Sequence, residues 1–171
     1  MDSVKVTVYS IVEQTFVVDS RSGLNSFGGI GLYDTEFHVK ESDSLIIEAN
    51  GGFYNGISNV QDANGFPGLA DPNFQPMLPN IASNSLIGSI GSSFSGNALL
   101  DDGLDIHPVT GQTGSELGHP GLYGLGFVGT SFSVRISSTS VGKIYFAIND
   151  SPLDDNSGNI TIKVQKLIFT E

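Results

Sequence analysis

A chain of 171 residues with 39% hydrophobic content is long enough to fold as one domain with a real core. Its 18 acidic and 7 basic residues give a formal net charge of −11, which argues against nucleic acid and anionic membranes as partners, because both require clustered cations. The chain has no cysteine, so a disulfide framework and a thiolate site are both excluded.

The sequence of the first fifty or so residues predicts strands separated by turns. Its 22 glycines, together with many short apolar runs, favour an all-β domain with long loops. Alternation of apolar and polar residues with period two marks each strand. The strands expected here are Val4–Tyr9, Gln14–Asp19, Thr35–Lys40 and Leu45–Ala49, the last of which ends at the turn signal Asn50-Gly51-Gly52.

The second part alternates between long loops and strands. Residues 52–84 contain no long periodic segment, and ordered loops of this length are usually functional. A second loop region covers residues 92–129. The strands expected around these loops are Ser85–Gly91, Ser131–Ile136, Lys143–Ile148 and Ile160–Val164.

Helical periodicity is nearly absent, and the strands number about eight. We therefore predict one domain over residues 1–171, an all-β, two-sheet, jelly-roll-like β-sandwich with long loops. The loops of such a fold collect at its two ends, and function is expected there.

The loop between the last two strands is the most informative stretch of the sequence. It carries three aspartates, Asp150, Asp154 and Asp155, followed by Asn156. Calcium takes six to eight oxygen ligands from carboxylates, amides and backbone carbonyls, and this loop offers all three kinds. The same residues also commonly form turns. From the residues alone, a polar hairpin and an oxygen cage for a cation both remain open.

The run from Gly142 to Asp150, then Ser151-Pro152 and residues 155–158, resembles the PA-IL-like galactophilic lectins, which are calcium-dependent bacterial sugar-binding β-sandwiches of the galactose-binding-domain-like type. Three earlier segments resemble the family in the same order, namely residues 33–39, 45–56 and 86–91. The resemblance covers roughly residues 32–169. It leaves 1–31 as an N-terminal strand extension and 92–129 as an insertion.

The resemblance implies a calcium site and a sugar site that share residues. Asp150, Asp155 and Asn156 would hold Ca²⁺ through their side chains, and Tyr54 through its backbone carbonyl. A further carbonyl would come from Leu153 or Asp154. Sugar contacts would come from Asp150, Ser151 and Asp155, together with Asp71 and Phe74 of the first loop. The last two stand where the galactose binders have His and Gln, so the sequence does not name the sugar.

We therefore expect a non-catalytic protein whose partner is a glycan bridged through loop-bound Ca²⁺, and multivalency makes a homo-oligomer plausible. The alternative is a structural or protein-interaction sandwich with calcium structural or absent. The sequence contains no Gly-x-Ser-x-Gly, His-Glu-x-x-His or phosphate-loop motif of an enzyme. The acidic stretch 101–107 is either a second cation site or a solvated loop. No signal peptide or apolar membrane span is recognised, which leaves a cytoplasmic protein or one secreted with its signal absent.

Overall fold

A computed structural model describes residues 9–23, 29–56, 60–66, 82–90, 126–136, 141–150 and 152–169. Within these ranges the chain forms nine strands: β1 (Tyr9–Asp19), β2 (Tyr33–Val39), β3 (Ser44–Asn55), β4 (Val60–Gln61), β5 (Leu86–Ile90), β6 (Gly126–Phe127), β7 (Ser131–Arg135), β8 (Gly142–Ile148) and β9 (Asn156–Phe169). None of the described residues belongs to a helix long and apolar enough to cross a membrane.

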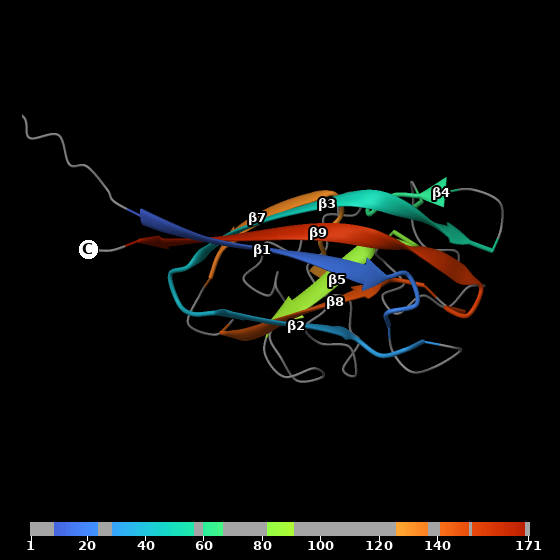
Figure 1. Cartoon of the computed structure of the whole chain (residues 1–171), viewed down its shortest axis with the longest axis horizontal. Coiled ribbons are helices and arrows are strands. Elements are labelled where there is room, and N and C mark those ends of the chain that lie inside the picture. Colours follow the sequence, from blue (N-terminus) through green and yellow to red (C-terminus); the bar gives the residue numbers. More distant parts are fainter. Residues whose placement is uncertain are drawn as a thin grey trace, which may run out of the picture.

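The strands form two stacked antiparallel sheets (Figure 1). The first sheet has the order β1-β9-β3-β4, with β7 also paired to the first half of β3, and the second has the order β2-β8-β5-β6. The predicted all-β, two-sheet sandwich is confirmed. The described residues add short strands, β4 and β6, that sequence periodicity did not reveal.

The core lies between the sheets and consists of the inward-facing residues of each strand. In β3, alternate side chains on either side of Gly51 are buried, including Leu45, Ile47 and Phe53, and β9 contributes Ile160 and Ile162 in the same way. This is the two-residue period expected when one face of a sheet packs on a core.

The turn predicted at Asn50-Gly51-Gly52, after the expected strand Leu45–Ala49, is wrong. β3 continues through both glycines to Asn55 and remains paired with β9 over twelve consecutive residues. Gly51 adopts a φ of 103°, which glycine tolerates because it has no Cβ, so the strand continues where the sequence signalled a break. The extended strand carries Tyr54 and Asn55 to one end of the sandwich.

The predicted break between Tyr9 and Gln14 is also wrong, because β1 is one strand that is paired with β9 over eleven residues without a register shift. The final strand begins at Asn156, four residues earlier than predicted, so the acidic loop is shorter than its composition suggested. Residues 1–31, predicted as an extension, therefore contain a full member of the first sheet.

Candidate functional site

Five strands bring their ends together at one end of the sandwich. Asn55 at the end of β3 pairs with Asn156 at the start of β9, and Asp19 at the end of β1 pairs with Asn159. In the second sheet, Leu86 at the start of β5 pairs with Ile148 at the end of β8. The loop 149–155, which joins the two sheets, is therefore surrounded by strand ends (Figure 1, right-hand side).

Asn149 fixes the start of this loop. Its N–H donates to the Ser85 carbonyl at 2.8 Å, its carbonyl accepts from the Asn84 N–H at 2.8 Å, and its Nδ2 donates to the Ala82 carbonyl at 3.1 Å. Asn84 adopts a φ of 61°, a left-handed conformation that asparagine tolerates better than most residues. The next residue, Asp150, is thereby held in a buried position with only 7% of its surface exposed.

Leu153 anchors the middle of the loop in the core. Its side chain is 1% exposed and belongs to the main hydrophobic cluster. It lies directly over Gly23, where an added Cβ would be only 2.5 Å from Leu153 Cδ1. This close approach therefore requires glycine at position 23. Leu153 anchors the loop at a point between its two polar ends.

Asn156 connects the end of the loop to the turn that follows β1. Its Nδ2 donates to the Ser20 carbonyl at 3.0 Å, while the Ser20 N–H donates to the Gly158 carbonyl at 3.1 Å. The Ser22 carbonyl accepts a hydrogen bond from the Ile148 N–H at 2.8 Å. The turn after β1 therefore holds both the strand that enters the loop and the strand that leaves it.

This end of the sandwich also contains buried polar atoms without partners in the described part of the chain. They are Asn156 Oδ1, Ser20 Oγ and Asn84 Oδ1. A buried acceptor left without a donor costs about 1–3 kcal/mol, so such atoms usually contact a water or an ion. An amide oxygen is a ligand that Ca²⁺ accepts, and a hydroxyl oxygen is equally hard. The chemistry of Asn156 and Ser20 therefore fits a hard cation.

The carboxylate of Asp155 lies against Gly56, the residue that follows β3. A Cβ added at Gly56, whose φ is 79°, would lie 2.5 Å from Asp155 Oδ2, so the carboxylate rests against this glycine. Tyr54 is paired with Ser157 of β9 and donates its hydroxyl to the Gly56 carbonyl at 3.1 Å. The loop and the Tyr54–Gly56 segment therefore meet, although they are about a hundred residues apart in the chain.

The pKa of Asp155 is raised above its ordinary value of 3.8, mainly because packing removes water from the carboxylate and also because Asp154 carries the same charge next to it. A hydrogen bond from its own backbone N–H opposes the rise. Since the folded state binds this proton more tightly than the unfolded state, the free energy of unfolding falls as the pH rises through the raised pKa.

We therefore expect Asp155→Asn to raise the melting temperature at neutral pH in EDTA, and the gain to vanish in acid, below the ordinary pKa of an aspartate. Thermal melts of both proteins across a pH series measure this. Glu41→Gln, an exposed change of the same charge in the β2–β3 turn, is the control and should show no such trend. A melting temperature for Asp155→Asn that stays equal to the parent's at neutral pH contradicts the prediction.

The predicted metal residues Tyr54, Asp150, Leu153, Asp154, Asp155 and Asn156 all lie at this end of the sandwich. Asp154 is exposed, and Leu153 uses its carbonyl to accept the Asn156 N–H at 3.3 Å. The predicted sugar-contact residues Asp71, Phe74 and Ser151 lie outside the described residues, as does the acidic stretch 101–107.

Sequence reasoning missed Ser20, Ser22 and Asn84, which come from segments treated as connections. A weak signal was present, because Ser and Asn next to strand ends often bind backbone groups. Nothing in the sequence, however, shows that Ser20 lies beside Asn156, 136 positions away.

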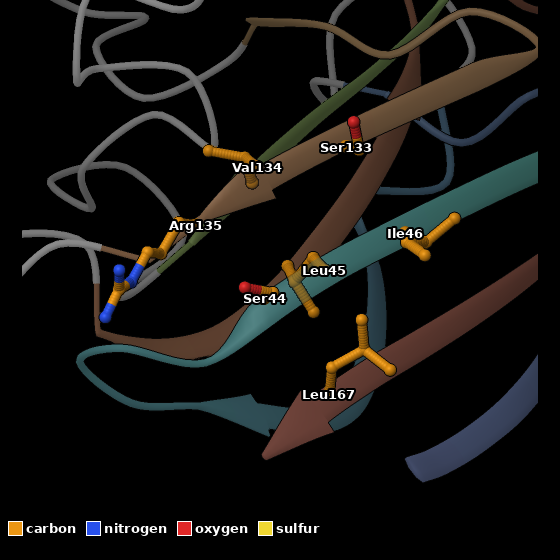
Figure 2. A pocket seen from close by; sticks show the side chains of 7 residues that line it. All are labelled: Ser44, Leu45, Ile46, Ser133, Val134, Arg135 and Leu167. Carbon is orange, nitrogen blue, oxygen red and sulfur yellow. The ribbon is translucent and has the colours of Figure 1, made fainter. Parts of the chain in front are cut away.

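A separate hollow of about 380 Å³ lies across β7, β3 and β9 of the first sheet. Figure 2 shows Arg135 at one end of it and Ile46 at the other, with Leu167 below. It is shallow, is lined by no carboxylate, and lies at the Ser44 end of β3, about 36 Å along the strand from Asn55. It is therefore a different surface from the loop end.

The molecule is thus a two-sheet β-sandwich with a buried polar cluster at one loop end. No family model matches the chain, and no curated protein matches it. It is similar to a solved structure described as "EclA N-terminal domain; PllA-like lectin", with a TM-score of 0.47 and 16% sequence identity over 94% of this chain and 97% of that chain. The roles of individual residues therefore depend on the contacts described above.

Proposed function

We propose that the protein is a non-catalytic, calcium-dependent carbohydrate-binding domain whose site is the loop end built from residues 149–156. The observation that carries the proposal is that this one loop holds two buried oxygen groups. Asp150 is only 7% exposed, and the amide oxygen of Asn156 is buried without a hydrogen-bond donor among the described residues. Two kinds of hard oxygen ligand are held there by a network of backbone hydrogen bonds.

Charge supports a cation at this end. Asp154 and Asp155 are neighbours in the chain, and their repulsion contributes to the raised pKa of Asp155. A divalent cation would favour the ionised forms of such carboxylates, whereas protonation is the alternative way to relieve the repulsion. The described residues contain no group of three or more His, Cys, Asp or Glu side chains suited to a metal, so amide and carbonyl oxygens must complete the ligand set.

The residues that would hold the ion are Asp150 and Asn156 through their side chains, with Asp155 from the exposed side of the loop. Bound calcium would supply open coordination positions for two adjacent hydroxyl groups of a sugar. The carboxylates of Asp150 and Asp155 would accept hydrogen bonds from those hydroxyls. The half-exposed ring of Tyr54, on the neighbouring strand end, offers an apolar surface for a sugar ring.

The second candidate is a protein-interaction sandwich in which calcium is structural or absent. Two observations favour it. The described residues contain no cluster of three or more acidic or other metal-binding side chains, and many polar groups at this end already form hydrogen bonds with the backbone.

Two measurements separate the candidates. We expect Ca²⁺ to raise the melting temperature and to bind in titration calorimetry, and we expect EDTA to abolish both effects. A glycan array with Ca²⁺ should then show binding that EDTA removes. Calcium binding without any glycan would favour the second candidate, and glycan binding that survives EDTA would contradict calcium dependence.

A further inference from the structure

Among the described strands, β1 forms an edge of the first sheet. Its eleven residues pair with β9, and no other described strand pairs with it. The stretch from Ser10 to Thr15 is exposed at every residue, so both faces of this half of the strand are accessible. An accessible edge presents a row of backbone N–H and C=O groups that can accept another strand.

Several of the usual protections of an edge strand are missing from β1. It contains no lysine and no proline, and its register with β9 has no bulge. Instead it carries exposed β-branched residues, with Ile11 and Val17 55% and 56% exposed on the outer face. Val12 is exposed on the inner face, beyond the reach of the core. A strand of this composition favours pairing with another strand over exposure to solvent.

We propose that a second copy of this chain pairs antiparallel with β1, about a two-fold axis that passes beside Gln14, and extends the first sheet across both copies. If both cores are to lie on the same side of the joint sheet, residues of like parity must face each other. With Gln14 facing Gln14, Ile11 faces Val17 of the second copy and Val12 faces its Phe16.

The apolar pairs in this register extend existing packing. Phe16 is a core residue of β1 itself, and it makes edge-to-face contacts with Tyr33 at 6.2 Å and with Phe37 at 6.3 Å between ring centroids. Val12 of the second copy would pack beside this aromatic group and remove its own exposed surface from water. Aromatic and β-branched residues are favourable cross-strand neighbours.

The charges disfavour two of the alternative registers. Glu13 is already bound by Lys163 at 3.4 Å and by Gln165 at 2.6 Å, and in this register it faces the hydroxyl of Thr15. If the two-fold axis lay one residue nearer the start of β1, beside Glu13, then Glu13 would face Glu13 of the second copy. If the axis lay two residues further along β1, beside Phe16, then Glu13 would face Asp19. Like charges directly opposite are destabilising, which matters in a chain with a net charge of −11.

The two-fold axis would place the loop ends at opposite ends of the assembly. Ser20 lies six residues beyond Gln14, so at 3.3 Å per residue the two copies of Ser20 would be about 40 Å apart. The pair would therefore present two sites facing in opposite directions. This proposal stands independently of what those sites bind.

A single introduced cysteine tests the axis, since the chain has none of its own. Directly opposed residues of an antiparallel pair have Cα atoms about 4.5–5.5 Å apart, which is within the range of a disulfide. We expect Gln14→Cys to form a covalent dimer under mild oxidation of the full chain. Val60→Cys, which lies on β4 and is also exposed, at 76%, is the control and should form no such dimer. Stronger cross-linking by Thr15→Cys, or none at Gln14→Cys beyond the control, overturns the register.

A charge exchange tests the pairing without a covalent bond. Ile11→Lys with Val17→Lys places like charges opposite each other and should give a monomer in sedimentation equilibrium over a concentration series. Ile11→Lys with Val17→Glu places opposite charges there and should restore the dimer. Both positions are exposed, so the fold of one copy should be retained, which circular dichroism checks. If the parent chain is monomeric throughout the series, or if both double variants behave alike, the proposal is wrong.

Discussion

Replacing Leu153 with alanine is expected to lower the free energy of unfolding by about 2–5 kcal/mol, the range found when a buried leucine is truncated. The side chain is 1% exposed and packs over Gly23, so its removal leaves a cavity where the loop meets the core. Denaturant unfolding measured in EDTA gives the loss directly. A loss below about 1 kcal/mol would mean that the loop is not held through this residue.

A double-mutant cycle with Gly23 sharpens this prediction. Gly23→Ala alone should destabilise, because its Cβ would come within 2.5 Å of Leu153 Cδ1. In the presence of Leu153→Ala the same substitution should cost less, since the new methyl group enters vacated space. We expect a coupling free energy of about 0.5–3 kcal/mol, as found for residues in contact. Strict additivity would contradict the packing of Leu153 on Gly23.

Leu45→Ala is the matched control for function. Leu45 is as buried as Leu153 but lies at the other end of β3, so it should lose a similar amount of stability. Below the unfolding transition we expect it to retain the calcium response. Leu153→Ala should weaken that response, because the loop would no longer be held in place.

Asp150→Asn is expected to reduce the affinity of the proposed site for calcium by about 10–100-fold or more. Losses of this size are found when a residue that only hydrogen-bonds to a metal ligand is replaced, and Asp150 is proposed as a ligand itself. The substitution keeps the shape of the side chain and removes its charge, and calcium affinity depends on the number of charged ligands. Calorimetric titration measures the affinity, and a glycan array run in parallel should show the same loss of sugar binding.

The control for Asp150 is Glu41→Gln, which changes the net charge equally but lies in the exposed turn before β3. It should leave the calcium affinity unchanged apart from a small long-range contribution, which salt screens. Melts in EDTA check that Asp150→Asn still folds. An unchanged calcium affinity for the folded variant would remove Asp150 from the site.

The sequence predicted those parts of the fold that depend on local alternation. β2, β7 and β8 lie where period-two patterning placed them, because one face of each packs on the core. It was wrong at Gly51 and Gly52, since a glycine pair signals a turn only when no neighbouring strand holds it. β3 is paired there with β9, and that pairing depends on residues more than a hundred positions away.

For the candidate site, too, the sequence pointed only to residues that a local stretch reveals. The composition of the acidic loop singled out Asp150, Asp155 and Asn156 as candidates, because their chemistry can be read from a single stretch, and their calcium role stays a prediction. The supports of that loop could not be identified in this way. Ser20 and Asn84 reach the loop only through the pairing of β1 with β9 and of β5 with β8, and no local pattern encodes which strands become neighbours.

The central position of β9 has a consequence for how the protein folds. β9 follows every other described strand in the chain, yet it lies between β1 and β3 and pairs with both along nearly its whole length. During synthesis, β1 and β3 therefore emerge with their hydrogen-bonding edges open to solvent and must wait for β9. Pairings across such long sequence separations are formed slowly. We therefore expect the first sheet to be completed only when β9 pairs with both of its neighbours, and the loop end to form with it.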